Sequence, residues 1–528
     1  MTAKGVQSEP GRMVPARPLA IEEPSPARPE RREAGLVEAL IAATAPGRPE
    51  TRASLDGFLR QSSPAAALHQ WLAFSGATRP ASKDDLVRML NRDVSFLDGL
   101  LSRQVNAILH HPRLQRLEAS WRGLRYLVEQ VEETDRIKIR VLSVGWRELA
   151  RDLERAIEFD QSQLFRKVYG DEFDMPGGEP FGMLVGDYEI HPRPSAAHPV
   201  DDVGVLGSIA QVAAAAFAPL VASAHPSMFG LDDFAGLEQP LGLTKTFDQL
   251  EYLKWNAFRE TEDSRFVGLA LPRVLMRLPY EDDGSRTDGF AFHEDVAGRD
   301  ARAYLWGSAA YAFAAVVIRA IAQSGWPAGI RGVQRDAEGG GLVSGLPVHC
   351  FSTDAHGVAP KCSTEVAITD RQEQELSDLG FIPLCACAGT EFSAFYGNQS
   401  VQKPRKYDEA AATMNARISA MLQYMLCVSR FAHYLKVMVR DKIGTFTEAG
   451  ECEKYLQDWL RNYVTADSDA SAQVKARYPL REANVQVREH PDKPGSYLCV
   501  AHLWPHFELD ELTTTIRLTT QLRPGRPG

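Results

Sequence analysis

PGGEPFGMLVGDYEI, at residues 176–190, is the stretch of sequence that decides the fold class. Its Pro-Gly-Gly start predicts a turn, and FGMLVGDYEI after it predicts a strand. A helix that carries Leu149, Leu153 and Ile157 is expected before this turn. Up to about residue 400, helical and strand patterns continue to alternate. This alternation predicts a mixed α/β (α+β) fold built in layers.

Two further elements are expected before this stretch. HPRLQRLEASWRGLRYLVEQ (111–130) has Pro112 near its start, which is typical of a helix N-terminus. Its apolar residues recur at helical spacing and form a stripe. The stripe consists of Leu114, Leu117, Trp121, Leu124 and Val128. RIKIRVLSV (136–144) alternates apolar with polar or basic residues, which predicts a strand.

Two alanine-rich runs are the most apolar parts of the chain. They are IAQVAAAAFAPLVASA (209–224) and YLWGSAAYAFAAVVI (304–318). Both are shorter than the roughly 20 apolar residues that a membrane helix needs. We therefore expect both runs to be buried, closely packed helices of a soluble protein.

The C-terminal part is expected to contain helices followed by strands. One helix of about 30 residues is predicted over 410–444 and a second over 451–463. ANVQVREHPDKPGSYLCVAHLWP (483–505) predicts two strands around a turn. LTTTIRLTTQL (512–522) alternates strictly and predicts a third strand. Its more apolar side carries Leu512, Thr514, Ile516, Leu518, Thr520 and Leu522.

Length and composition limit the possible classes of protein. A chain of 528 residues is expected to form two or three domains. The net charge of −10 offers no basic surplus for nucleic acid, so we expect no nucleic-acid binding. The N-terminus lacks the continuous apolar stretch of a secretion signal. Seven cysteines in a chain of this length predict free thiols and a cytoplasmic protein without direct membrane insertion.

We divide the chain by its pattern into five parts. They are a disordered N-terminal arm (1–32), short helices (33–82), a main mixed α/β domain (83–402), a C-terminal domain of helices and a β-sheet (403–522), and a tail (523–528). The expected architecture is therefore a multi-domain chain with flexible terminal arms.

No motif predicts catalysis, a cofactor or a metal. AEGGGLVSGLPVH (337–349) matches neither the spaced glycines of dinucleotide sites nor the P-loop, so a tight loop is expected there. The acidic runs at 260–263 and 281–283 predict solvated loops or intersubunit ion pairs. We therefore expect no enzyme, with no catalytic, cofactor-binding or metal-binding residues. An enzyme that uses the Gly339–Gly341 loop is an unfavoured alternative.

Several segments, in order from about residue 83 to 522, resemble one family. It is the large subunit of the type VI secretion contractile sheath, the TssC or VipB family. The matching segments are LEASWRGLRYLV (117–128), FDQSQLFRKVYGDEF (159–173), PGGEPFGMLVGDYE (176–189), FRETEDSRFVGLALPRVLMRLPY (258–280), YLWGSAAYAFA (304–314), GGGLVSGLPVH (339–349), TEVAITDRQEQELSDLGFIPL (364–384) and SRFAHYLKVMVRDKIG (429–444). The chain departs from the family in an insertion at 334–337 and in a longer region before Lys83.

The resemblance implies a structural role. In that family, the large subunit pairs with a small subunit (TssB or VipA) and with other copies of itself. The heterodimers form a helical sleeve around an Hcp tube, above a baseplate, and contraction propels the tube. A ClpV-type AAA+ ATPase then dismantles the contracted sleeve. A sheath-like subunit of another phage-tail-like contractile particle is the alternative.

The resemblance also suggests two interaction segments. GLVEALIAAT (35–44) is similar to the family's short N-terminal helix, which is associated with ATPase recognition. Its expected docking face is Leu36, Val37, Leu40 and Ile41. The alternative is that this helix packs on the small subunit. The predicted last strand, with Leu512, Thr514, Ile516 and Leu518, is expected to join subunits by strand exchange.

Overall fold

The computed structural model describes most of the chain between residues 57 and 506. The described ranges are 57–74, 80, 82–132, 137–239, 242–285, 289–296, 301–333, 339–349, 362–441, 449–467, 470–489 and 497–506. The chain divides into two compact units, 1–104 and 105–528. The predicted helix at 35–44, the predicted strand at 512–522 and the insertion at 334–337 lie outside the described residues.

The described part of the first unit is helical. It contains α3 (Pro64–Phe74) and most of α4 (Lys83–Leu109), which continues into the second unit. Ser82 begins α4, because its hydroxyl accepts a hydrogen bond from the Asp85 N–H at 3.1 Å. The Trp71 indole donates to the Asp93 carboxylate at 3.0 Å and joins the two helices.

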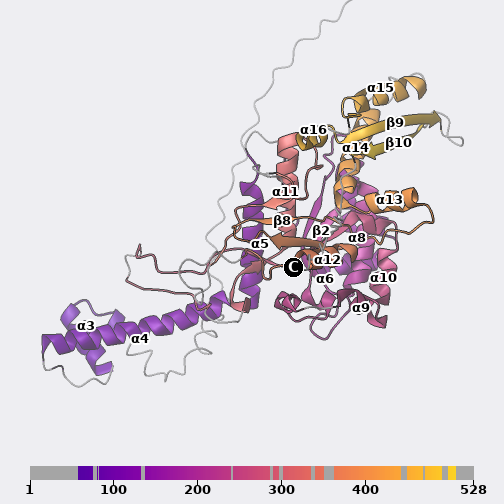
Figure 1. Ribbon diagram of the computed structural model, residues 1–528. Coiled ribbons are helices and arrows are strands. Elements are labelled where there is room, and N and C mark those ends of the chain that lie inside the picture. Colours follow the sequence, from indigo (N-terminus) through magenta and orange to yellow (C-terminus); the bar gives the residue numbers. More distant parts are fainter. Residues whose placement is uncertain are drawn as a thin grey trace, which may run out of the picture. The chain divides into compact units, whose positions relative to one another are not determined.

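A six-stranded sheet forms the centre of the second unit (Figure 1). Its order is β1-β2-β3-β7-β8-β6, with β1, β2, β3 and β7 parallel and the last two strands antiparallel to their neighbours. The strands are β1 (Leu184–Ile190), β2 (Leu220–Ala224), β3 (Val267–Leu271), β7 (Ile382–Ala386), β8 (Ser393–Phe395) and β6 (Leu342–Val343). The predicted turn at 176–178 and the strand after it are confirmed.

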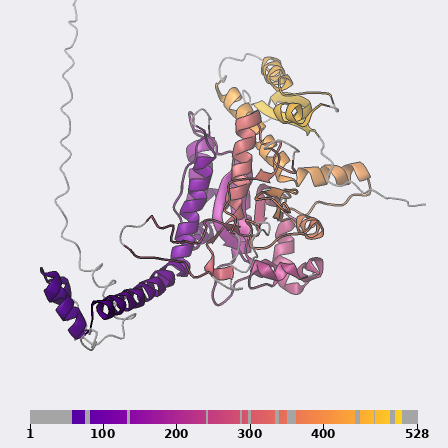
Figure 2. The ribbon, with the colours of Figure 1, turned by 60° about the vertical axis from the view of Figure 1, so that its left-hand side comes forward.

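Helices cover both faces of this sheet, because alternate strand residues enter two separate cores. In β2, Leu220 and Ala222 enter one core and Val221 enters the other. The first core also receives α6 (Trp146–Arg155), α8 (Asp202–Ala216), α9 (Leu243–Phe247), α10 (Leu253–Arg259) and α12 (Asp370–Asp378). The second receives α5 (Pro112–Glu129) and α11 (Ala309–Ser324), which lie side by side (Figure 2). The prediction of a mixed α/β fold is confirmed.

The C-terminal helices and a hairpin have a core of their own. They are α13 (Ala410–Ser419), α14 (Leu422–Asp441), α15 (Ala449–Arg461), α16 (Ala472–Arg477), β9 (Leu480–Glu489) and β10 (Tyr497–Pro505). The third core contains Trp326, Phe431, Leu456 and Leu460 together with residues of β9. The two predicted strands of this hairpin are confirmed. Further short elements include α7 (Gln163–Phe165), a π-helical turn (Arg166–Phe173), β4 (Val274–Leu275), β5 (Trp306–Gly307) and several 3-10 turns.

Three predicted elements are wrong. The run 209–224 is not one helix: α8 ends at Ala216 and β2 follows Pro219, because a short apolar run suits a buried strand as well as a helix. The helix over 410–444 divides at Ala420, whose carbonyl accepts the Ser400 N–H at 2.8 Å. Residues 137–144 form no strand, since no neighbour pairs with their main chain among the described residues.

Candidate assembly surfaces

The structure places none of the interaction residues predicted from sequence. Leu36, Val37, Leu40 and Ile41, and likewise Leu512, Thr514, Ile516 and Leu518, lie outside the described residues. Their roles therefore remain predictions. The surfaces below consist of other residues, most of which the sequence patterns did not single out.

Helix α5 exposes several of its large apolar side chains, whereas Leu127 and two small residues are buried. Leu117, Trp121 and Val128 are exposed, and 64% of Trp121 is accessible. The side of α5 that faces α11 contains Ala119 and Gly123. A Cβ atom on Gly123 would lie 2.4 Å from the Tyr311 ring, so only glycine permits this approach. The predicted stripe of α5 exists, but much of it forms an apolar outer surface.

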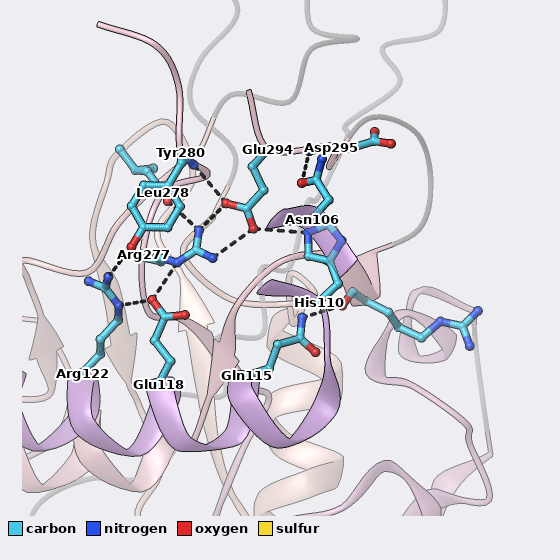
Figure 3. Close-up of polar contacts among 11 residues, drawn as sticks. Asn106, His110, Gln115, Glu118, Arg122, Arg277, Leu278, Tyr280, Glu294 and Asp295 are labelled. Carbon is cyan, nitrogen blue, oxygen red and sulfur yellow. Dashed lines mark hydrogen bonds and ion pairs between the residues drawn. The ribbon is translucent and has the colours of Figure 1, made fainter. Parts of the chain in front are cut away.

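A buried ion-pair network fixes the segment after β4 to the inner side of α5 (Figure 3). The Arg277 guanidinium donates to both Glu294 carboxylate oxygens, at 2.5 and 2.9 Å, and to Glu118 on α5 at 2.8 Å. The side chains of Arg277 and Glu294 are 6% and 1% exposed. Glu118 also accepts from Arg122, four residues later on the same helix.

Neighbouring hydrogen-bond donors stabilise the ionised form of the Glu294 carboxylate. Burial alone would raise the pKa of Glu294, but the hydrogen bonds from Arg277 and from the Tyr280 N–H lower it overall. His110, near the end of α4, approaches the same carboxylate at 3.2 Å. The network therefore joins three separate segments through one carboxylate.

Residues 137–144 form a second exposed surface. Ile137 and Ile139 pack against the core of α5 and α11, whereas Val141 is 67% exposed. Within the described residues, the only hydrogen bond to the main chain of this segment comes from the Tyr188 hydroxyl, which donates to the Val144 carbonyl at 2.7 Å. The segment thus lies beside β1, the edge strand of the sheet, without joining it.

The hairpin of β9 and β10 has one closed edge and one open edge. The Gln457 side chain of α15 donates to the Ala483 carbonyl and accepts from the Val485 N–H, both at 2.9 Å. Glu453 accepts from the Val487 N–H at 2.9 Å. The outward main-chain groups of β10 have no protein partner among the described residues. An exposed edge of this kind favours the addition of another strand.

A histidine cluster that the sequence analysis missed lies at the C-terminal ends of β1 and β2. His191 stacks between His198 and His225, with ring centroids 4.1 and 4.0 Å apart. The Asp202 carboxylate pairs with His191 at 3.0 Å and with His198 at 2.6 Å, and it accepts from the Trp146 indole at 2.6 Å. The only feature of the sequence that could have indicated this cluster is the four-residue spacing of His198 and Asp202.

This cluster fits a hydrogen-bonded network better than a metal site. The ligand atoms of His191, His198 and Asp202 all lie within 4.8 Å of one another. Tetrahedral ligands of one zinc ion stand about 3.4 Å apart, whereas the two His–Asp contacts are 3.0 and 2.6 Å, which are hydrogen-bond distances. Burial alone would raise the pKa of Asp202, but hydrogen bonds from His191 and His198 lower it. Burial lowers the pKa of His225 to about 4, and the Glu189 carboxylate only partly opposes this shift.

The glycine loop is packed, as the sequence predicted. The Gly341 N–H donates to the Gly332 carbonyl at 2.7 Å, and Arg319 donates to the Gly340 carbonyl at 3.0 Å. A Cβ atom on Gly341 would lie 2.2 Å from the Phe395 carbonyl oxygen. The Gly341 amide and the carbonyls of Gly339 and Gly340 therefore bond within the protein.

The acidic run at 281–283 agrees with the prediction of a solvated loop, whereas Asp263 of the first run is half-buried and begins a short 3-10 helix. Asp282 and Asp283 are exposed or nearly so and accept hydrogen bonds from the N–H groups two residues ahead, at 3.1 and 2.9 Å. Across the described residues, no helix is both long and apolar enough to cross a membrane.

Comparison with known proteins gives matches over most of the chain. The family model described as VipB, EvpB/VC_A0108, tail sheath N-terminal domain, matches residues 91–402. The model described as VipB_2, tail sheath gpW/gp25-like domain, matches residues 411–522. The type VI secretion system sheath protein TssC1 of Pseudomonas aeruginosa is 44% identical over 442 residues, which cover 83% of this chain and 87% of that protein.

Two solved structures show a more distant likeness. One is a baseplate of the anti-feeding prophage, with a TM-score of 0.33 and 9% identity over 61% of this chain and 67% of that chain. The other is the contracted PVC sheath complex of an extracellular contractile injection system, with a TM-score of 0.34 and 11% identity over 60% of this chain and 68% of that chain.

Proposed function

Because the chain belongs to the VipB family of tail sheath proteins, we propose that it is the large structural subunit of a type VI secretion contractile sheath. The observation that carries this proposal is the 44% identity to a type VI sheath protein over 83% of the chain. In the proposed role, the chain pairs with a small TssB-like subunit and polymerises with other copies of itself around an Hcp tube. Contraction would propel that tube away from a baseplate.

The exposed surfaces support a subunit that becomes buried in an assembly. Trp121 and its apolar neighbours cover the outer side of α5, and Val141 extends the exposed apolar area of the same unit. Aromatic side chains of this kind contribute strongly to protein interfaces. We propose that α5 contacts the small subunit or a neighbouring large subunit through this outer side.

The open β10 edge supports strand exchange between subunits. We propose that residues 512–522 of a second copy add to this edge, with Leu512, Thr514, Ile516 and Leu518 on the side that faces α15. The hairpin has a matching polarity: Val485 and Val487 are buried towards α15, whereas the opposite side carries Asn484 and Arg488. Deletion of residues 511–528 should then leave soluble subunits but prevent long sheaths.

The N-terminal helix is proposed to be the contact for recycling. Leu36, Val37, Leu40 and Ile41 would dock on a ClpV-type AAA+ ATPase, with packing on the small subunit as the alternative. Leu40→Asp should weaken ATPase binding in a pull-down while tubules still form. Unchanged binding would reject the docking role, and loss of tubules would favour the alternative.

The overall proposal is tested by co-expression with a candidate small subunit, followed by electron microscopy. Hollow tubules of regular diameter are the expected result, and their absence with two soluble, folded subunits would contradict the proposal. We further propose that the protein acts in the cytoplasm and is not an enzyme. Its family's structural role and the packed Gly339–Gly341 loop support this view.

A further inference from the structure

The β9–β10 sheet has an edge that the protein closes with its own side chains. Antiparallel pairing joins Val485 to Ala501 and Val487 to Cys499. The outward N–H groups of Val485 and Val487 bond to Gln457 and Glu453 instead of to β10. At these pairs the main-chain groups of the two strands therefore point away from each other.

The geometry of α15 explains how two side chains can replace a strand. Cys452, Leu456 and Leu460 are buried and pack on the face of the sheet. Glu453 follows Cys452 in the sequence, and Gln457 follows Leu456. Glu453 and Gln457 are four residues apart, so they lie on one side of α15, next to the buried row and beside the edge of β9. Four helical residues rise about 6.0 Å and two strand residues about 6.8 Å. Because these two rises are similar, side chains four residues apart on α15 can each reach a main-chain group that points outward from β9, where such groups recur every two residues.

Gln457 bonds as a residue of a neighbouring strand would. Its amide donates to the Ala483 carbonyl and accepts from the Val485 N–H, the two groups that flank Asn484. A residue in a parallel strand makes the same pair of bonds. Glu453 has no donor to offer as an ionised carboxylate, and it bonds only to the Val487 N–H.

The edge of β9 would otherwise be open to another chain. A groove of about 510 Å³ lies along it, lined by Glu453, Gln457, Arg461, Trp504 and further residues of α15 and β9. At the start of β9, residues 463–465 pair in parallel with Leu480. Further along, the side chains of Glu453 and Gln457 occupy the bonding groups of Ala483, Val485 and Val487.

We propose that Glu453 and Gln457 close the β9 edge and direct an incoming strand to β10. This inference rests on the proposed strand exchange between subunits, and it adds which edge of the hairpin receives the strand. The occupant is the segment 512–522 of a second copy, which has one apolar and one polar side, as the hairpin has. Without the two side chains, the sheet would offer two edges, and a subunit could accept its neighbour's strand on the wrong side.

Disulfide trapping tests which edge receives the strand. Arg517→Cys on the polar side of the segment is combined with Val500→Cys or His502→Cys on β10, or with Gln486→Cys on β9. Two cysteines bridge only when their Cα atoms are within about 7 Å, so a strand on β10 cannot reach Gln486. Tubules of the full chain with its small subunit are oxidised and analysed for covalent dimers, with Arg517→Cys alone as the background.

The β10 reporters should form dimers and the β9 reporter should not. Adding Glu453→Leu and Gln457→Leu should raise the Gln486→Cys dimer at least about tenfold, since three main-chain groups lose their partners. The matched control Lys454→Leu/Asp458→Leu also places two leucines on α15, four residues apart, but removes no bond to β9, so it should leave the pattern unchanged. Glu453→Gln keeps an acceptor and should leave the β9 reporter at background.

Two outcomes would overturn the inference. Dimers through Gln486→Cys in the otherwise unaltered chain would show that β9 is open, while tubules and β10 dimers would leave the sheath function intact. If neither the β10 nor the β9 reporters formed dimers, the segment 512–522 would not be the strand that adds to this hairpin. Failure of the sheath proposal itself would appear separately, as absence of tubules in the chain without any substitution.

Discussion

Removing the Glu294 carboxylate should destabilise the second unit severely. Glu294→Ala takes away the acceptor for two Arg277 hydrogen bonds and for the Tyr280 N–H. Both partners of the pair are almost fully buried, so the guanidinium keeps its charge but loses most of its compensation. Breaking a buried pair in this way costs about 3–5 kcal/mol of unfolding free energy.

Two partners of Arg277 remain and limit the loss. Nε still donates to Glu118 and Nη1 to the Leu278 carbonyl at 3.1 Å, while both terminal nitrogens lose their bonds to Glu294. We therefore expect the loss of unfolding free energy in Glu294→Ala to fall within the range for a broken buried pair. The double variant Arg277→Met/Glu294→Met should recover most of this unfolding free energy. The double variant buries no unpaired charge at this position, and apolar replacements of buried pairs are often nearly neutral.

Urea unfolding of the purified chain, followed by tryptophan fluorescence, measures these differences. Arg125→Ala is the matched control, because Arg125 forms an exposed pair with Glu129 on the same helix and such pairs contribute little. Equal losses for Glu294→Ala and Arg125→Ala would contradict the buried network. A double variant less stable than both single variants would contradict the role assigned to the unpaired charge.

Three further predictions concern packing, pH and assembly. Gly123→Ala should reduce the unfolding free energy by about 1–3 kcal/mol, and Tyr311→Ala in the same chain should reduce the added loss, as measured by urea unfolding. The pKa of His225 is about 4 when folded and about 6.5 when unfolded, so the unfolded chain binds the proton more readily and stability should fall between pH 6.5 and 4 by up to about 3 kcal/mol. His225→Asn, which keeps an acceptor for the Ser227 N–H, should flatten this part of a stability–pH profile, and an unchanged profile would contradict the assignment. Trp121→Asp should abolish tubules while changing the unfolding free energy by less than about 0.5 kcal/mol, and Arg125→Ser should form normal tubules.

The sequence predicted elements well where local signals were strong. Pro112 begins α5, and the alternating residues of the hairpin form β9 and β10. The run 209–224 was wrong beyond Ala216, since its apolar composition does not distinguish a buried helix from a buried strand. The break at Ala420 was also beyond local reasoning, because it depends on a bond to Ser400.

Surfaces were harder to predict than elements. The stripe on α5 was visible in the sequence, but periodicity does not say whether an apolar face meets the same chain or another one. The edge closed by Gln457 and Glu453 could not be predicted, because it depends on how α15 lies on β9. The cluster around Asp202 joins residues from three segments of the chain. Of these residues, only His198 has a helix-like spacing of four residues from Asp202 in the sequence.

The orientation of α5 has a consequence for how the cell must supply this protein. The helix packs small residues such as Gly123 against its own chain and exposes Trp121, which a neighbouring subunit would cover in the proposed assembly. A copy made without that neighbour exposes an apolar surface that invites aggregation. Synthesis of the subunits in matched amounts would then protect solubility as well as provide the parts of a sheath.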